Sequence, residues 1–80
     1  MDDEADEPEP DIMILERLKI WRSEQAHKEG VSPFMVAHNA VLESIATSKP
    51  KDLKSLKRVK GMGEKKLEKY GEEMLKIANA

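Results

Sequence analysis

The chain has 80 residues and no cysteine, so it can form neither a disulfide bond nor a thiolate metal site. Aromatic side chains are also scarce, with one Trp, one Tyr and one Phe. The core of so small a domain must therefore be mostly aliphatic, which suits helices. No apolar run approaches the roughly 20 residues needed to cross a bilayer, and the acidic start does not suit a signal peptide. We expect one small intracellular domain, cytoplasmic or nuclear, with no membrane contact.

Basic residues are absent from the first 16 positions, which hold eight acidic residues. The remaining positions hold 14 basic and eight acidic residues, so this part carries a net charge of +6 although the whole chain carries −2. Residues 49–69 alone hold nine basic and three acidic residues. Charge segregated in this way indicates a polyanionic partner such as nucleic acid, or an acidic protein surface.

Residues 1–11 contain two prolines and almost no apolar side chains, so burial cannot offset the entropy cost of ordering them. We predict a disordered acidic linker over residues 1–11 and a helical domain over residues 12–80. An alternative role for the linker is that of an acidic mimic, which folds back over the basic face and weakens nucleic-acid binding.

Apolar residues spaced three and four apart predict helices along the rest of the chain. Asp11 and Asn39 suit N-caps, Gly30 suits a helix end, and Pro33 opens a new segment after a turn. No segment offers a strand for another to pair with, so we predict an all-α fold. The expected segments are residues 12–29, a short helical or irregular connector over 34–37, 39–48, a short helix from 51 or 52 through 56, and 64–79.

The aromatic residues Trp21 and Tyr70 lie on the apolar stripes of the first and last expected helices. We therefore expect both in the core rather than exposed for stacking on bases. Gly71 inside the last helix costs roughly 1 kcal/mol relative to Ala, which indicates close packing or a local kink.

The stretch over residues 56–71 combines turn chemistry with clustered positive charge. Gly61 and Gly63 bracket Met62 and lead into a helix whose first N–H groups suit an anion. Two interpretations stay open, because the glycines can serve close packing of two helices or contact with phosphate. Lysine and arginine side chains around the turn favour phosphate contact without base specificity. The candidate nucleic-acid-binding residues are Lys57, Arg58, Lys60, Gly61, Gly63, Lys65, Lys66 and Lys69.

A catalytic or cofactor site is not indicated. The turn lacks the Gly-x-x-x-x-Gly-Lys-Ser/Thr pattern of a P-loop, so we expect no nucleotide site. His27 and His38 are isolated, and the acids of residues 2–11 have no rigid frame to hold metal-ligand geometry. We expect no enzyme activity, no metal and no cofactor in this chain.

Four motifs in order resemble the HRDC (helicase and RNase D C-terminal) domain, and most closely those of RecQ-type helicases. The resemblance spans about residues 14–78, while Ser32 and His38 stand where the family often has other residues. The turn also resembles, locally, the hairpin of helix-hairpin-helix DNA-binding motifs. The four motifs are Leu15-x-x-Leu18-x-x-Trp21-Arg22, Val31-Ser-Pro-Phe34, Asn39-Ala-Val-Leu42 and Leu56-x-x-Val59-x-Gly61-Met62-Gly63-x-x-Lys66-Leu67-x-x-Tyr70-Gly71.

The resemblance implies a compact, SAM-like bundle of about five short helices that serves as an accessory domain. It implies that the parent protein is a DNA helicase acting in DNA repair and recombination. The acidic residues 1–11 would then be the linker between this domain and the catalytic domain of that helicase. The expected partners are single-stranded or branched DNA, bound weakly by a monomer, and the catalytic domain of the parent helicase. Alternatives are a docking module for a protein or for the parent enzyme, and an accessory domain of an RNase D-like exonuclease.

Overall fold

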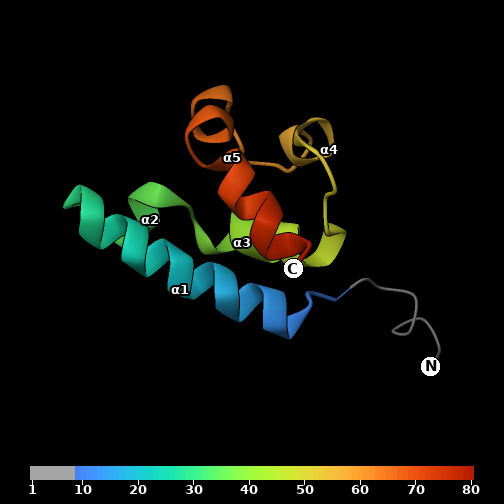
Figure 1. Cartoon of the computed structure of the whole chain (residues 1–80), viewed down its shortest axis with the longest axis horizontal. Coiled ribbons are helices and arrows are strands. Elements are labelled where there is room, and N and C mark those ends of the chain that lie inside the picture. The colour runs from blue at the N-terminus through green and yellow to red at the C-terminus, as the bar shows by residue number, and fades with distance from the viewer. Residues whose placement is uncertain (1–8) are drawn as a thin grey trace.

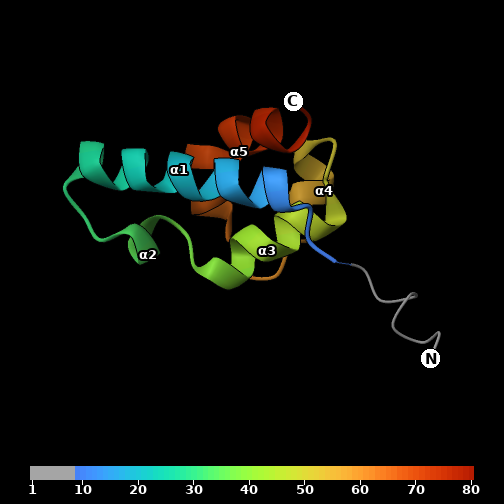
Figure 2. The ribbon, with the colours of Figure 1, turned by 90° about the horizontal axis from the view of Figure 1, so that it is seen from below.

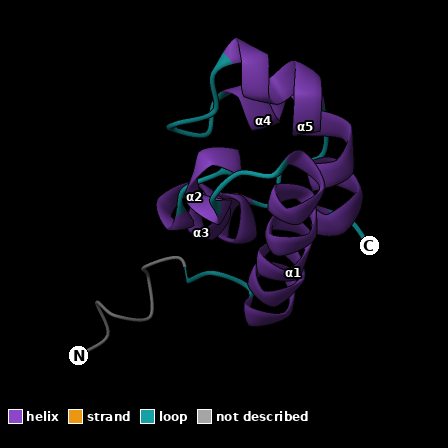
Figure 3. Ribbon diagram, turned by 90° about the vertical axis from the view of Figure 1, so that its left-hand side faces the viewer, coloured by secondary structure: helices purple, strands orange, loops and turns teal. Residues whose placement is uncertain are grey.

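The computed structural model describes residues 9–80, and that part of the chain contains helices and no strands (Figures 1 and 3). The all-α prediction is confirmed, including the number of helices. The predicted acidic linker lies mostly outside the described residues. The helices are α1 (Ile12–Glu29), α2 (Pro33–Val36), α3 (Asn39–Ser48), α4 (Leu53–Lys57) and α5 (Glu64–Ala78).

Local chemistry fixes both ends of α1 as the sequence predicts. The Asp11 carboxylate accepts hydrogen bonds from the N–H groups of Met13 and Ile14, at 3.0 and 3.2 Å. Gly30 ends the helix in the left-handed conformation, with φ of 71°. The N–H of Asp11 also donates to the carbonyl of Ala46 at 3.0 Å, so this residue of the acidic segment is part of the folded body.

The segment between α1 and α3 follows the prediction except at one cap. Pro33 occupies the first turn of α2, as expected for a residue without an N–H. The prediction of Asn39 as the N-cap of α3 is wrong, because His38 occupies that position. The carbonyl of His38 accepts from the N–H groups of Val41 and Leu42, at 3.0 and 3.2 Å, so Asn39 is already helical.

The core forms where α1 packs against α2, α3 and α5, and where α4 packs against α5 (Figure 2). Trp21 is half-buried at the edge of this core and meets Tyr70 edge-on, with ring centroids 5.4 Å apart. Tyr70 is 4% exposed and lies in the core as expected, whereas Trp21 packs against the core without being buried in it. The largest fully buried side chains are aliphatic or Met: Leu18, Val36, Leu42, Ile45, Leu56 and Met74.

The α4–α5 turn, residues 58–63, joins two helices by inserting side chains into the core. Val59 and Met62 are 8% and 5% exposed and fill the space beneath the turn. Gly61 has φ of 93°, and a Cβ there would lie 2.7 Å from Cγ2 of Val41. Close packing therefore requires this glycine, whatever partner the outer face of the turn binds.

Close packing also explains Gly71, for which the sequence allows either packing or a kink. A Cβ at this position would lie 2.8 Å from Cδ2 of Leu53, so the missing side chain lets α4 approach α5. Among the described helices, none is long and apolar enough to span a membrane.

Candidate nucleic-acid interface

A groove of about 1040 Å³ is lined by residues along the length of α3, by the loop that follows it, and by residues of α4 and the α4–α5 turn. Two chain segments supply its positive charge, Lys49 and Lys51 from one and Arg58 and Lys60 from the other. We call this surface, defined by those four residues, the basic groove. All four residues are exposed.

Two of the acidic side chains at the basic groove already have partners within the chain. The Asp52 carboxylate accepts from the N–H of Ser55 at 2.7 Å as the N-cap of α4, and this hydrogen bond lowers the pKa of Asp52. Asp11 lies 3.6 Å from the ammonium of Lys49 in an exposed ion pair. Glu43 is the other acidic lining residue, so the groove keeps an excess of positive charge.

Several of the residues that the sequence singled out lie in the α4–α5 turn or beside it in α4 and α5. Arg58 and Lys60 line the basic groove, and Lys65 is exposed in the first turn of α5. The Lys57 ammonium lies 3.7 Å from Glu64 in an exposed ion pair. Gly63 is the N-cap of α5, and a Cβ there would meet no other atom within 4 Å, unlike a Cβ at Gly61.

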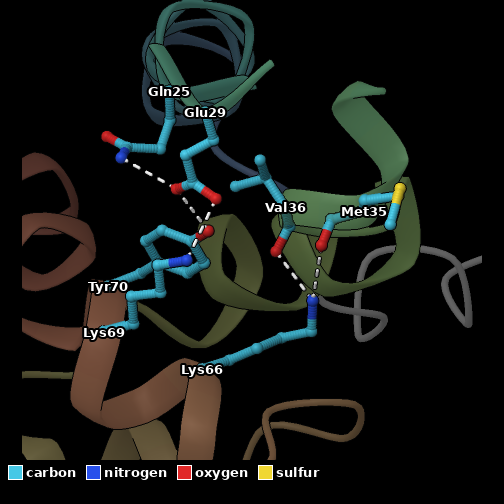
Figure 4. A network of polar contacts seen from close by, with 7 residues as sticks. All are labelled: Gln25, Glu29, Met35, Val36, Lys66, Lys69 and Tyr70. Atoms are coloured by element: carbon cyan, nitrogen blue, oxygen red, sulfur yellow. Dashed lines mark hydrogen bonds and ion pairs between the residues drawn. The ribbon is translucent and has the colours of Figure 1, made fainter. Parts of the chain in front are cut away.

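Lys66 has a role within the fold that the sequence did not reveal. Its ammonium donates to the carbonyls of Met35 and Val36 at 3.1 and 2.9 Å (Figure 4). These carbonyls belong to the last residues of α2, which has too few residues to satisfy them by its own helical hydrogen bonds. Lys66 therefore ties α5 to α2, and its charge is directed inward.

Lys69 likewise has a partner within the chain. Its ammonium lies 3.0 Å from Oε1 of Glu29, while Oε2 accepts from the Tyr70 hydroxyl at 2.7 Å and from Gln25 at 3.0 Å (Figure 4). The hydrogen bond from Tyr70, followed by those from Gln25 and Lys69, lowers the pKa of Glu29 from 4.5 to about 2. Glu29 thus links the end of α1 to the middle of α5.

A second exposed surface lies beside α2. Phe34 is 58% exposed, and its ring is tilted against His38 with centroids 5.9 Å apart. Both residues line a shallow pocket together with Arg22, whose guanidinium donates to the carbonyl of Ala37 at 2.9 Å. An exposed aromatic ring beside a guanidinium is a surface on which a nucleic-acid base can stack.

Sequence reasoning missed Lys49 and Lys51 as groove residues, although both lie within the basic stretch. Arg58 and Lys60, the other two basic lining residues, follow only after α4, so the fold and not the spacing brings the two pairs to one groove. Over residues 9–80, no three His, Asp or Glu side chains gather as metal ligands would.

Comparison with known proteins decides the family. The family model of the HRDC domain matches residues 11–78. The chain belongs to the HRDC domain family. Its structure matches that of the D. radiodurans RecQ HRDC domain 3 with a TM-score of 0.82 and 40% sequence identity, over 85% of this chain and 90% of that one.

Two helicases contain segments similar to this HRDC domain. The ATP-dependent DNA helicase RecQ of Bacillus subtilis (strain 168) is 38% identical over 58 residues, which cover 72% of this chain and 10% of that protein. The ATP-dependent DNA helicase UvrD2 of Mycobacterium tuberculosis (strain ATCC 25618 / H37Rv) is 34% identical over 67 residues, 84% of this chain and 10% of that protein. The chain therefore spans about a tenth of the length of these relatives.

The resemblance predicted from the four motifs is confirmed, and with it the helical fold that it implied. The HRDC domain is an accessory domain of RecQ-like helicases. The surface by which this HRDC domain contacts a partner depends on its own residues.

Proposed function

We propose that this HRDC domain is an auxiliary, non-catalytic module of a DNA helicase that binds single-stranded or junction DNA weakly through its phosphate backbone. The observation that carries the proposal is the basic groove, where two segments of the chain bring four basic residues together. Lys65 and the first N–H groups of α5, which begins after Gly63, add further positive charge just beyond the α4–α5 turn. Phosphate contacts of this kind position a strand without reading its sequence.

The proposal assigns DNA contact to fewer residues than the sequence predicts. Arg58, Lys60 and Lys65 carry the side-chain contacts, and Lys57 contributes where its exposed ion pair opens. Lys66 and Lys69 contribute less, because their ammonium groups already have acceptors within the fold. Gly61 contributes through packing of the turn.

Weak binding suffices in a domain attached to a motor. Once the motor domain holds a strand, binding of the same strand by the linked HRDC domain is an intramolecular step. For a short linker the effective concentration of that step is about millimolar. The domain then helps the helicase hold or choose its substrate without a high affinity of its own.

Charge variants with a matched control test the proposal. Arg58→Gln/Lys60→Gln removes two groove charges, whereas Arg17→Gln/Lys19→Gln removes the same pair of residue types, at the same spacing, from the exposed surface of α1. We expect the groove variant to lower the slope of log affinity against log salt by about 0.7 per lost phosphate contact for a single strand. Fluorescence anisotropy with a labelled oligothymidylate measures this slope, and equal slopes for the two variants would contradict the proposal.

A second candidate function is docking onto the catalytic domain of the parent helicase. Met13 and Ile20 favour it, because they lie seven residues apart on one face of α1 and are 64% and 60% exposed. Met13→Ser/Ile20→Ser would then weaken association with the separately purified catalytic domain and leave oligothymidylate affinity unchanged. The relatives RecQ and UvrD2 are DNA helicases, which favours a helicase over an RNase D-like exonuclease as the parent.

A further inference from the structure

Lys49 ends α3 in a backbone conformation that favours glycine. Its φ of 49° and ψ of 61° are left-handed, and over residues 9–80 it is the one residue other than glycine with a positive φ. Gly30 ends α1 in the same conformation, with φ of 71°. A side chain strains this conformation, which is why glycine is the usual residue at such helix ends. The chain therefore holds a lysine where a glycine would be more stable.

Two helices, α3 and α5, fix the segment that begins at this lysine. The N–H of Lys49 donates to the carbonyl of Ile45 at 2.8 Å. Pro50 is buried, and its carbonyl accepts from Nδ2 of Asn79 at 2.9 Å. The same amide group of Asn79 donates to the carbonyl of Leu75 at 2.8 Å. The end of α5 is therefore bonded to the loop that follows α3.

Residues 49–51, which we call the lysine arm, present two positive charges to the basic groove. Lys49, Pro50 and Lys51 all line the groove, and both lysines are exposed. The ion pair of Lys49 with Asp11, at 3.6 Å, is exposed and weak, so a phosphate can replace the carboxylate. The ring of Pro50 fixes one backbone angle between the two lysines. Strained residues that are held by their surroundings are typical of ligand clamps.

We propose that the lysine arm is a preformed phosphate clamp of the basic groove, and that Asn79 is the positioning residue that holds it. The inference rests on the proposed function, because the phosphates belong to the strand that the groove binds. Lys49 and Lys51 contact the phosphates, while Asn79 acts through the carbonyl of Pro50. An arm that is already ordered loses less conformational entropy on binding than a free loop does. The competing explanation is that α3 ends at Lys49 and that this side chain binds no strand.

Asn79→Ala tests the positioning role without changing any charge. It removes both hydrogen bonds but keeps Lys49 and Lys51, so affinity falls only through their placement. We expect oligothymidylate affinity at low salt to fall about two- to ten-fold, the range that ordering of one long side chain gives. Gln25→Ala is the control, because it removes an amide that donates to Glu29 at 3.0 Å outside the groove lining. It should lower stability and leave affinity unchanged. Fluorescence anisotropy measures affinity at a temperature where circular dichroism shows each variant folded.

A double-mutant cycle separates positioning from general disturbance of the groove. In the Lys49→Gln/Lys51→Gln background, Asn79→Ala should lower the affinity no further, because the side chains that it positions are absent. An equal fall in both backgrounds would overturn the inference. An unchanged affinity of Asn79→Ala in the wild-type background would overturn it as well.

Lys49→Gly changes stability and binding in opposite directions. Relief of the strained conformation should raise the midpoint of thermal unfolding by about 2–6 °C. Loss of one phosphate contact should lower the slope of log affinity against log salt by about 0.7, whereas Lys19→Gln on the exposed surface of α1 should leave the slope unchanged. A midpoint at or below that of the wild type, or an unchanged slope, would contradict the clamp.

Failure of this inference differs from failure of the proposed function. The inference alone fails when Arg58→Gln/Lys60→Gln lowers the salt slope but the Asn79 and Lys49 variants bind as the wild type does. A wild-type domain that binds no oligothymidylate at low salt would overturn the proposed function and the clamp together.

Discussion

Single residues in the α4–α5 turn and in the first turn of α5 divide between packing and exposure, although the sequence presents them as one motif. Gly61 and Gly63 are two positions apart, yet only Gly61 has a positive φ and a close neighbour, Val41. Lys65 and Lys66 are adjacent, yet only Lys66 is bonded to α2. Neither distinction is readable from the sequence, because each depends on a partner from a distant part of the chain.

Gly61→Ala should destabilise the domain by about 1–3 kcal/mol, because the new Cβ requires a strained φ and clashes with Val41. Gly63→Ala is the matched control. Its φ of −73° suits any residue, so the loss of a favourable N-cap glycine and the gain in unfolded-state rigidity should leave a net change within about 0.5 kcal/mol. Urea denaturation followed by helical circular dichroism measures both, and equal destabilisation would refute the packing role.

Glu29 should make the stability of the domain depend on acid pH. Its folded pKa of about 2 lies below the ordinary 4.5, so its contribution is fully present above pH 4.5 and is lost as the pH falls through about 2. Urea denaturation between pH 7 and pH 2 should show a shallower loss of stability for Glu29→Gln than for the wild type. Glu24→Gln, an exposed change on the same helix, is the control and should keep the wild-type pH dependence. A wild-type pH profile in Glu29→Gln would contradict a stabilising role for the hydrogen bonds that Glu29 accepts from Tyr70, Gln25 and Lys69.

At the scale of elements, local signals predict the helices well. Asp11, Gly30 and Pro33 act on their own neighbours in the chain, and α1 and α2 accordingly begin and end close to where the sequence predicts. The predicted cap of α3 is wrong by one residue, because Asn39 has the chemistry of an N-cap while the first carbonyl accepting helical bonds is that of His38. The positions of helices are predictable from neighbouring residues, whereas the ties between helices are not.

The tie between α5 and α2 supports an element-level prediction. Lys66→Met keeps the aliphatic stem but removes the donors to Met35 and Val36, and should lower the free energy of unfolding by about 1–2 kcal/mol. Lys65→Met, at the neighbouring exposed position, should leave stability within about 0.5 kcal/mol and weaken oligothymidylate binding more than Lys66→Met does. Thermal unfolding and fluorescence anisotropy measure the two effects. The opposite ranking of the two variants in both assays would contradict the division of roles between these lysines.

At the scale of the whole molecule, charge and fold contribute separate information. The sequence predicts the family from its motifs and a polyanionic partner from its segregated charge. Only the fold brings Lys49, Lys51, Arg58 and Lys60 to one groove, which Pro10 also lines. A chain with net charge −2 thus presents a basic surface.

The most direct test of the basic groove is a map of amide chemical shifts during titration with an oligothymidylate, at low and at moderate salt. We predict shifts at Lys49, Lys51, Arg58 and Lys60 that fade as the salt concentration rises. The amides around Met13 and Ile20 should not move. No shifts at low salt, or shifts on the α1 face and not in the groove, would contradict the account.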